Sequence, residues 1–357
     1  MTLGALLSVA LLMLAGYSWL TFRNINNGLD RPNITALNQP PQHVQHQATF
    51  NGKDQNILLV GYDDRSNMTA AEIKKLKVGR DGGSLNTDTM MILHVPADGS
   101  KATLISLPRD SWVHIPGYGY NRLNAAYAYG FTNTKGTKQD RQAAGANLLI
   151  DTTENLTGLT INHYVQVSFM GFYEISNAIG GVPINLCENV DDTHKYNVAH
   201  GEDGGSGFKM SKGHHLIKGV TALEFVRQRH NLAGGDLERE KRQQYFLTQA
   251  FKQVASVGIL TKLHALGTAI KRNIIVDPSL NILDLARQME NLSAGNITGK
   301  TIPTKPRVIN GSDVLVVHPK QVQTFVDHAI NGNPNATHHK HHRHHHAGNP
   351  AQAKCIH

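Results

Sequence analysis

Short apolar runs interspersed with helical segments are the feature that most restricts the fold of this chain. The runs at 56–61, 90–95 and 102–107 have the length and composition of buried strands. Further strands are expected at 163–169 and 182–187. Strands mixed with helices in this way predict an α/β sandwich built on a mixed sheet. A capping-box pattern at Thr69 and Glu72 predicts a short helix at 72–77. Further helices are expected at 121–130, 138–156, 171–179, 218–225, 236–256, 261–272, 281–292 and 319–330.

A hydrophobic core, rather than a disulfide framework, must stabilise this fold. The 357 residues fit one larger α/β domain with appendages and contain two cysteines, Cys187 and Cys355. Their pairing is left open, because Cys355 lies in a low-complexity segment that we expect to be disordered. Composition predicts an anchor at 1–22, a linker at 23–54, a folded domain at 55–330 and a histidine-rich tail at 331–357.

An uncharged N-terminal segment predicts a membrane anchor. As a helix rising about 1.5 Å per residue, 1–22 is long enough to cross about 30 Å of hydrocarbon. A cleaved signal peptide is the alternative, but the apolar stretch is long for one and no small-residue cleavage site ends it. Arg23 and Arg31 after the span would place the domain inside by the positive-inside rule. A large folded domain translocates largely regardless of its charges, so we expect it outside the cell.

Charge and composition narrow the partners. The formal net charge of +8 suits an anionic substrate or an anionic cell surface and is too modest to indicate nucleic-acid binding. The histidines within 338–346 predict weak binding of Zn²⁺ or Ni²⁺, or added positive charge in acid, rather than catalysis. The glycine-rich segment 188–208 predicts a mobile rim.

A concentration of arginines after residue 225 predicts a site for an anion. If 225–229 is extended, Arg227 and Arg229 project to the same face, because side chains alternate along a strand. A pair of glycines then breaks the chain, and Asp236 is the expected N-cap of the next helix. Arginine forks bind phosphate oxygens with two parallel hydrogen bonds, so a pyrophosphate or phosphodiester is the expected ligand.

The helix after this turn adds to the cluster and also carries the opposing interpretation. Arg239 and Gln243 share one helical face at i,i+4. The alternative is an ordinary solvated face, because Glu238, Glu240 and Lys241 suggest surface charge pairing. Both interpretations remain open from this segment alone.

Two aspartates flank the first two strands. Asp63 follows the first strand and Asp88 precedes the second, so the two meet at one edge if these strands are antiparallel. Mg²⁺ binds through one or two carboxylates together with waters and phosphate oxygens, which predicts a metal site here. The alternative is that both are turn residues, a common role for aspartate.

A third polar cluster, Pro108-Arg109-Asp110, ends the third strand. Proline stops the hydrogen-bond ladder and aims Arg109 at the sheet edge. The alternative is a surface ion pair between Arg109 and Asp110.

Five separate motifs carry a resemblance to a known family. They are NILLVGYDDR, TDTMMIL, TLISLPRDSWVHIPGYGYNRLNAAYAYG, VQVSFMGFYEISNAIGGVPINL and ALEFVRQRHNLAGGDLEREKRQQ, in order from about Asn56 to Gln244. Together they resemble the LytR-CpsA-Psr family of Gram-positive cell-wall enzymes, and weaker similarity continues to about Ile330. An anchor followed by an extracellular domain is also that family's layout. Asn86 departs from the family pattern, which often has an arginine there.

The resemblance implies a three-layer α/β/α catalytic domain at 55–330 that transfers a glycan phosphate from a polyprenyl-pyrophosphate carrier to peptidoglycan. It assigns Mg²⁺, with Mn²⁺ as an alternative, to Asp63 and Asp88. It assigns pyrophosphate contacts and active-site positions to Arg109, Arg227, Arg229, Asp236, Arg239 and Gln243. Further substrate contacts are expected from Arg65, Asp110, Asn124 and Arg242.

We therefore expect a single-pass membrane protein whose extracellular domain is a Mg²⁺-dependent glycopolymer–peptidoglycan phosphotransferase with a pyrophosphatase-like side activity. Asp63, Asp88 and Asp110 remain candidates for the general base, although a metal-bound aspartate is a poor base. A non-catalytic module that binds polyprenyl phosphate or polysaccharide is the first alternative. A transcriptional regulator is disfavoured, because no helix-turn-helix pattern is present and a membrane segment argues against access to DNA.

Overall fold

The computed structural model describes most of the chain, in several segments. The described residues are 30–38, 53–65, 68–78, 83–193, 205–228, 230, 232, 236–257, 273–281, 284–285, 288–289, 292, 294–332 and 355–357. The anchor expected at 1–22, the helix expected at 261–272 and the histidine-rich tract lie outside them. None of the helices in these segments is both long enough and apolar enough to span a membrane.

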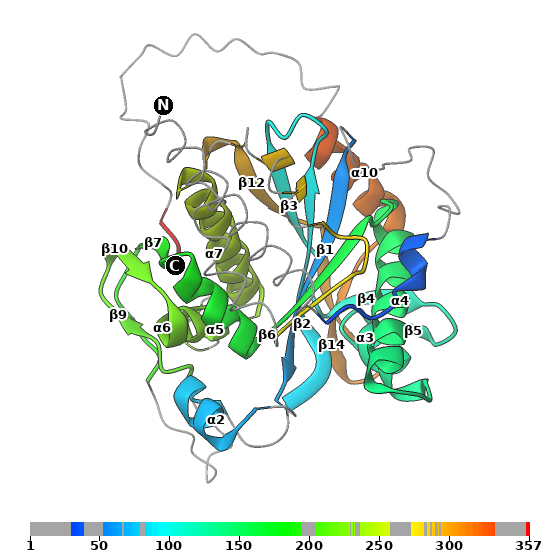
Figure 1. Ribbon diagram of the computed structural model, residues 1–357, viewed down its shortest axis with the longest axis horizontal. Helices are drawn as coiled ribbons and strands as arrows, with labels where there is room; N and C mark the ends of the chain where they lie inside the picture. Colours follow the sequence, from blue (N-terminus) through cyan, green and yellow to red (C-terminus); the bar gives the residue numbers. More distant parts are fainter. Residues whose placement is uncertain are drawn as a thin grey trace, which may run out of the picture.

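A six-stranded mixed sheet forms the centre of the molecule, in the order β11-β6-β1-β2-β3-β12 (Figure 1). Its strands are β1 (Gln55–Asp64), β2 (Gly83–Val95), β3 (Ala102–Ser106), β6 (His163–Ser168), β11 (Ile274–Val276) and β12 (Ile297–Thr301). β1 is parallel to β6 and β3 is parallel to β12, whereas the other neighbours are antiparallel. The predicted α/β fold with a mixed sheet is confirmed.

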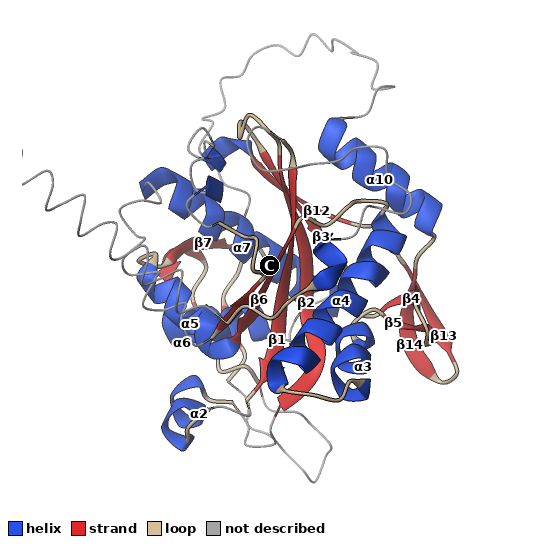
Figure 2. Cartoon of the chain, turned by 45° about the vertical axis from the view of Figure 1, so that its right-hand side comes forward, coloured by secondary structure: helices blue, strands red, loops and turns tan. Residues whose placement is uncertain are grey.

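Apolar side chains at alternate positions of the central strands pack on opposite faces of this sheet, which is why helices cover both. In β1, Leu58 and Val60 belong to the buried cluster on one face, and Ile57 and Leu59 pack on the other. The first face is covered by α3 (Ala125–Asn133), α4 (Lys138–Thr157) and α10 (Pro319–Asn331) (Figure 2). The second is covered by α5 (Phe169–Ala178) and α7 (Asp236–Val257), and α6 (Gly219–Arg227) packs against both helices.

Smaller sheets surround this core, and only some of their strands were predicted from the sequence. Beside α3 and α4 lies a four-stranded sheet, β13-β14-β4-β5 (Figure 2). Its strands are β4 (Ser111–Ile115), β5 (Gly119–Arg122), β13 (Lys305–Ile309) and β14 (Ser312–Val316). Two antiparallel pairs join β7 (Val182–Leu186) to β10 (Gly213–Ile217) and β8 (Val190–Asp191) to β9 (Lys209–Met210). The short helix α2 (Ala70–Leu76) begins with the capping box of Thr69 and Glu72 that its sequence predicts.

Two local predictions are wrong for identifiable reasons. Residues 225–227 are not extended, because α6 continues to Arg227 and buries Ala222, Leu223 and Val226 in its own cluster. The helix expected at 121–130 begins only at Ala125, because Gly119–Arg122 pairs with β4 as β5. In both cases tertiary packing decides the local conformation.

The C-terminal residues pack against β7. Cys187 and Cys355 form a disulfide with a Cα–Cα distance of 5.0 Å. Ile356 donates its amide to the Asn185 carbonyl at 2.8 Å and accepts from the Cys187 amide at 3.0 Å. The disulfide joins residues 168 positions apart, so it restricts a long loop of the unfolded chain. The tail predicted to be disordered therefore ends in an ordered segment, 355–357.

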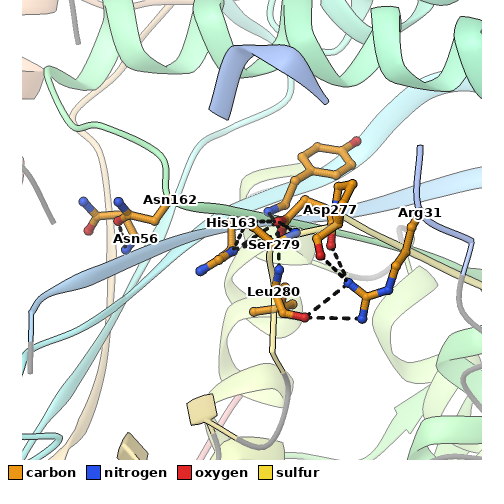
Figure 3. A network of polar contacts seen from close by, with 9 residues as sticks. Arg31, Asn56, Asn162, His163, Asp277, Ser279 and Leu280 are labelled. Atoms are coloured by element: carbon orange, nitrogen blue, oxygen red, sulfur yellow. Dashed lines mark hydrogen bonds and ion pairs between the residues drawn. The ribbon is translucent and has the colours of Figure 1, made fainter. Parts of the chain in front are cut away.

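The segment 30–38 is attached to the central sheet at its edge strand β11. Asp30 pairs with Ile275 as an isolated bridge. Arg31 donates through Nη1 to the carbonyl oxygens of Asp277 at 2.8 Å and Leu280 at 3.3 Å (Figure 3). Ile34 is buried in the core cluster beneath α4. The predicted linker at 23–54 is thus wrong for these residues, which belong to the folded domain.

A buried carboxylate organises the turn that Arg31 holds. Asp277 accepts from the backbone amides of Tyr164 at 3.1 Å, Ser279 at 2.9 Å and Leu280 at 3.0 Å, and it lies 3.1 Å from His163 Nδ1 (Figure 3). Burial alone would raise the pKa of Asp277. The hydrogen bonds and the neighbouring imidazole outweigh burial, and the pKa is lowered.

We expect Asp277→Asn to destabilise the fold by about 2–4 kcal/mol at neutral pH, because an amide turns a donor toward backbone N–H groups that need an acceptor. A carboxylate with a lowered folded-state pKa stabilises fully above its unfolded pKa of about 3.9 and loses this contribution as the pH falls through the folded value. Urea unfolding of both proteins from pH 7 to pH 3 measures the difference. It should narrow below about pH 4, and a constant difference would contradict the assignment.

Candidate active site

The ends of β1 and β2 bring two carboxylates together. The strands are antiparallel, with Gly61 opposite Thr89 and Tyr62 opposite Thr87, so Asp88 is the extra residue of a bulge. A bulge re-aims the side chain that it contains. A Cβ on Gly61 would lie 3.1 Å from the Thr89 Cβ, so this close approach favours glycine. The antiparallel arrangement confirms the condition under which the two aspartates were expected to meet.

Asp63 is buried and bound by Arg65. The Arg65 Nε donates to Asp63 Oδ1 at 2.6 Å, and a second nitrogen pairs with the other carboxylate oxygen. Burial raises the pKa of Asp63; the Arg65 guanidinium opposes this effect, and the negative charge of Asp88 adds to it. The two carboxylates therefore lie close enough to repel each other.

Arg109 lies at the centre of an alternating series of charges. Its Nη1 donates to Asp88 Oδ1 at 2.6 Å, and its Nε is 3.5 Å from Asp110 Oδ2. The other oxygen of Asp110 is 3.6 Å from Arg122 Nε. The order Asp88–Arg109–Asp110–Arg122 thus runs from the central sheet to β5.

Two further guanidiniums meet over one aromatic ring. The Cζ atoms of Arg227 and Arg65 lie 5.4 and 5.9 Å from the centre of the Phe169 ring. Arg227 ends α6, and its charge opposes the rise in the pKa of Asp63 that burial causes. Phe169, which the sequence analysis did not select, therefore positions two of the predicted arginines.

Helix α7 contacts the same region through consecutive turns. Gln243 accepts from Thr89 Oγ1 at 2.9 Å and donates to the Val226 carbonyl at 3.2 Å, which joins the bulge of β2 to the end of α6. Arg239, one turn earlier, is 3% exposed. The predicted i,i+4 pair is therefore on the face of α7 that approaches β2.

Of the other predicted residues, Arg242 bonds the C-terminal segment, whereas Asn124 adjoins this group through its backbone. Arg242 is 1% exposed, donates through Nε to the His357 carbonyl at 2.6 Å and also bonds Gln228; burial lowers its pKa to about 10. Asn124 is buried, and its backbone joins Thr87 to Arg109. The side chains of Arg229 and Asp236 lie outside the described residues.

Glu240 is buried, whereas the alternative interpretation of this helix placed it on a solvated face. It is 7% exposed and accepts the backbone amide of Arg109 at 3.3 Å. Glu238 and Lys241 do form a surface pair, at 2.5 Å. The signal available in the sequence was helical spacing, since Glu240 lies at i,i+3 from Gln243 on α7.

The fold is a mixed α/β architecture, and arginines and aspartates gather at one end of its central sheet. The LytR_cpsA_psr family model matches residues 22–331, and the chain belongs to that family. It is 37% identical over 300 residues to the cell wall biosynthesis protein LcpA of Corynebacterium glutamicum, covering 77% of this chain and 55% of LcpA. The chain thus spans about half the length of that relative.

Two other matches have nearly complete coverage. The chain is 28% identical over 334 residues to the polyisoprenyl-teichoic acid–peptidoglycan teichoic acid transferase TagU of Oceanobacillus iheyensis, covering 93% of each. A solved structure of YwtF (TagT) with bound octaprenyl pyrophosphate lipid matches with a TM-score of 0.54 and 18% identity. That match covers 82% of this chain and 97% of the solved one, and it shows a common fold.

We expect Glu240→Ala to destabilise the protein by about 1–3 kcal/mol, because it leaves the buried amide of Arg109 without its acceptor. Lys241→Ala is the matched control on the same helix and should cost about 0.5 kcal/mol or less, as surface pairs contribute little. Urea unfolding of the three proteins measures both effects. Equal losses would show that Glu240 does not support the Arg109 turn.

Proposed function

We propose that this protein transfers a phosphate-linked glycopolymer from a polyprenyl-pyrophosphate carrier to peptidoglycan. The observation that carries the proposal is the convergence of Arg65, Arg109 and Arg227 with Asp63 and Asp88 at one end of the central sheet. Membership of the LytR_cpsA_psr family supports it, as do the names of TagU and LcpA. The lipid in the TagT structure is the class of carrier that we propose.

The arginines bind the pyrophosphate by exchanging partners. In the structure, Asp63 neutralises Arg65 and Asp88 neutralises Arg109. A pyrophosphate offers these guanidiniums oxygens in the same bidentate geometry as a carboxylate. Phosphoryl transfer requires chiefly positioning and offsetting of charge, and fixed guanidiniums supply both without reorganising during the reaction.

When the arginines bind the pyrophosphate, the carboxylates of Asp63 and Asp88 become available to a divalent cation. No group of three or more His, Cys, Asp or Glu residues in the described segments could hold a metal on its own. Asp63 and Asp88 nevertheless supply the two carboxylates with which Mg²⁺ is commonly bound, and their mutual repulsion favours a cation between them. Mg²⁺, or Mn²⁺ in its place, would offset the charge of the pyrophosphate and of the leaving phosphate.

The proposed substrate implies that the folded domain lies outside the cell. Peptidoglycan lies beyond the membrane, and the uncharged segment 1–22 has the composition of an anchor. We infer a single-pass protein with its folded domain outside. Protease treatment of intact protoplasts should digest this domain, and complete protection would reverse the orientation.

We expect Arg109→Lys to lose turnover nearly as far as Arg109→Ala, by about 10²-fold, because lysine keeps the charge and loses the fork. Arg307→Lys is the control, on exposed β13. The measurement is glycan transfer, compared with the affinity for the donor lipid in the same variants. Wild-type turnover in both Arg109 variants would favour the alternative of a binding module without catalysis.

We expect Mg²⁺ to raise the melting temperature of the wild-type protein in the presence of inorganic pyrophosphate, because a ligand that binds only the native state stabilises it. The shift should vanish in the double variant Asp63→Asn/Asp88→Asn and persist in Asp327→Asn, at an exposed position of α10. Differential scanning fluorimetry measures it without relying on activity. An unchanged shift in the double variant would exclude this metal site.

A further inference from the structure

The four-stranded sheet has an outward face that the proposed reaction has not used. Across the β4–β5 hairpin, Trp112 is opposite Arg122 and His114 is opposite Tyr120. The intervening residues Val113 and Ile115 are buried in the core cluster. Strand alternation therefore places the first four side chains together on the face away from the core.

A pocket opens on this face between β4–β5 and the turn that joins β13 to β14. Its volume is about 280 Å³, which is near the lower end of ligand pockets, about 300–1,000 Å³. The lining includes Trp112, Arg122 and Ser312, and the amides Asn86, Asn121 and Asn124. An aromatic surface beside several amides suits a sugar ring, because amides both donate to and accept from hydroxyl and N-acetyl groups.

This pocket shares a wall with the phosphate site. Arg122 lines the pocket and reaches Asp110, whose other oxygen faces Arg109. The Asn124 amide, also at the pocket, donates to the Arg109 carbonyl at 3.0 Å. Asp110 does not itself line the pocket, but it lies 3.6 Å from the lining residue Arg122, on the side of the pocket that adjoins Arg109.

We propose that this pocket binds an amino-sugar ring of the acceptor peptidoglycan strand and that Asp110 accepts the proton of the attacking hydroxyl; the inference rests on the function proposed above. The hydroxyl oxygen forms a new bond to the phosphorus that carries the glycan. The bond from that phosphorus to the bridging oxygen breaks, and its electron pair leaves with the polyprenyl phosphate. The proton passes to an Asp110 carboxylate oxygen and then to solvent.

The position of Asp110 favours the acceptor over the sugars of the donor. A donor sugar is already bonded to phosphate and needs no base, whereas an attacking hydroxyl must lose its proton to one. An aspartate performs this task in protein kinases despite its low basicity. Beyond the pocket, the exposed rings of Tyr118 and Tyr120 extend the same hairpin, so the surface continues past one ring as a glycan strand requires.

The first test is binding of an uncrosslinked N-acetylglucosamine–N-acetylmuramic acid tetrasaccharide, followed by tryptophan fluorescence. The chain has two tryptophans, Trp19 and Trp112, so Trp19→Phe leaves Trp112 as the only reporter. We expect a saturable change that Ser312→Phe abolishes by filling the pocket and that Val308→Thr, on the neighbouring exposed strand, leaves intact. No change with the tetrasaccharide would overturn the proposal.

The second test separates the two substrates kinetically. Ser312→Phe and Trp112→Ala should each raise KM for the acceptor at least about tenfold and leave KM for the donor lipid unchanged. Asp110→Asn should lower kcat about 10²-fold at constant acceptor KM, with partial recovery in Asp110→Glu. A rise in donor KM instead would assign the pocket to the donor glycan and overturn the proposal, as would wild-type kcat in Asp110→Asn.

Failure of the proposed function would look different. If the wild-type protein binds the tetrasaccharide at Trp112 but transfers no glycan, the transferase function and the proton transfer to Asp110 are wrong, and the sugar pocket stands. If it transfers glycan without binding the tetrasaccharide, the function stands and the pocket is wrong.

Discussion

The antiparallel pairing of β1 with β2 is the constraint on which the site depends. It brings residues that are 25 positions apart in the sequence, Asp63 and Asp88, to one end of the sheet, and the bulge at Asp88 turns a strand residue into a side chain available to Arg109. The other predicted side chains that the structure brings to the site lie around this pair. Arg65 follows β1 directly, Arg109 follows β3, Arg227 ends α6, and Gln243 of α7 holds the bulge through Thr89.

Ion pairs between the arginines and the aspartates allow so many charges to lie close together in the absence of a substrate. Several guanidiniums in one place would repel each other, and a pair of carboxylates would do the same. The structure alternates them, so that Arg65 and Arg109 each have an acidic neighbour. Ion pairs of this kind contribute modestly to stability, because the cost of desolvation offsets much of the attraction. The partner exchange that we propose, with a pyrophosphate and a cation, would use both halves of these ion pairs.

Local sequence patterns predicted the elements whose signals lie within a few residues, and they failed where tertiary contacts decide. Apolar runs identified β1, β2, β3 and β6 of the central sheet but not its edge strands β11 and β12, and the capping box of Thr69 located α2. Strands β13 and β14 were not predicted, because most of their residues are exposed and carry no continuous apolar signal. Glu240 was assigned to the surface by its charged neighbours, and only the packing of α7 against the Arg109 turn shows that it is buried. The segment 30–38 has a polar composition, and its attachment depends on Asp277, nearly 250 residues away.

Helix α7 and the C-terminal segment attached to it explain how the site keeps its geometry. One face of α7 presents Gln243 to β2, and Arg242, next to it in sequence, holds the C-terminal segment against β7. At the β11 edge of the central sheet, Arg31 holds the segment 30–38 against the turn that follows β11. Donors that stabilise a developing charge are effective only when they are held in place before the reaction, so rigidity around the site has a direct chemical value. In the function that we propose, the contact of Arg242 with the C-terminal segment supports the reaction without touching the substrate, because it holds α7, from which Arg239 and Gln243 project. Arg31 stabilises the β11 edge of the sheet, from which none of the proposed site residues projects.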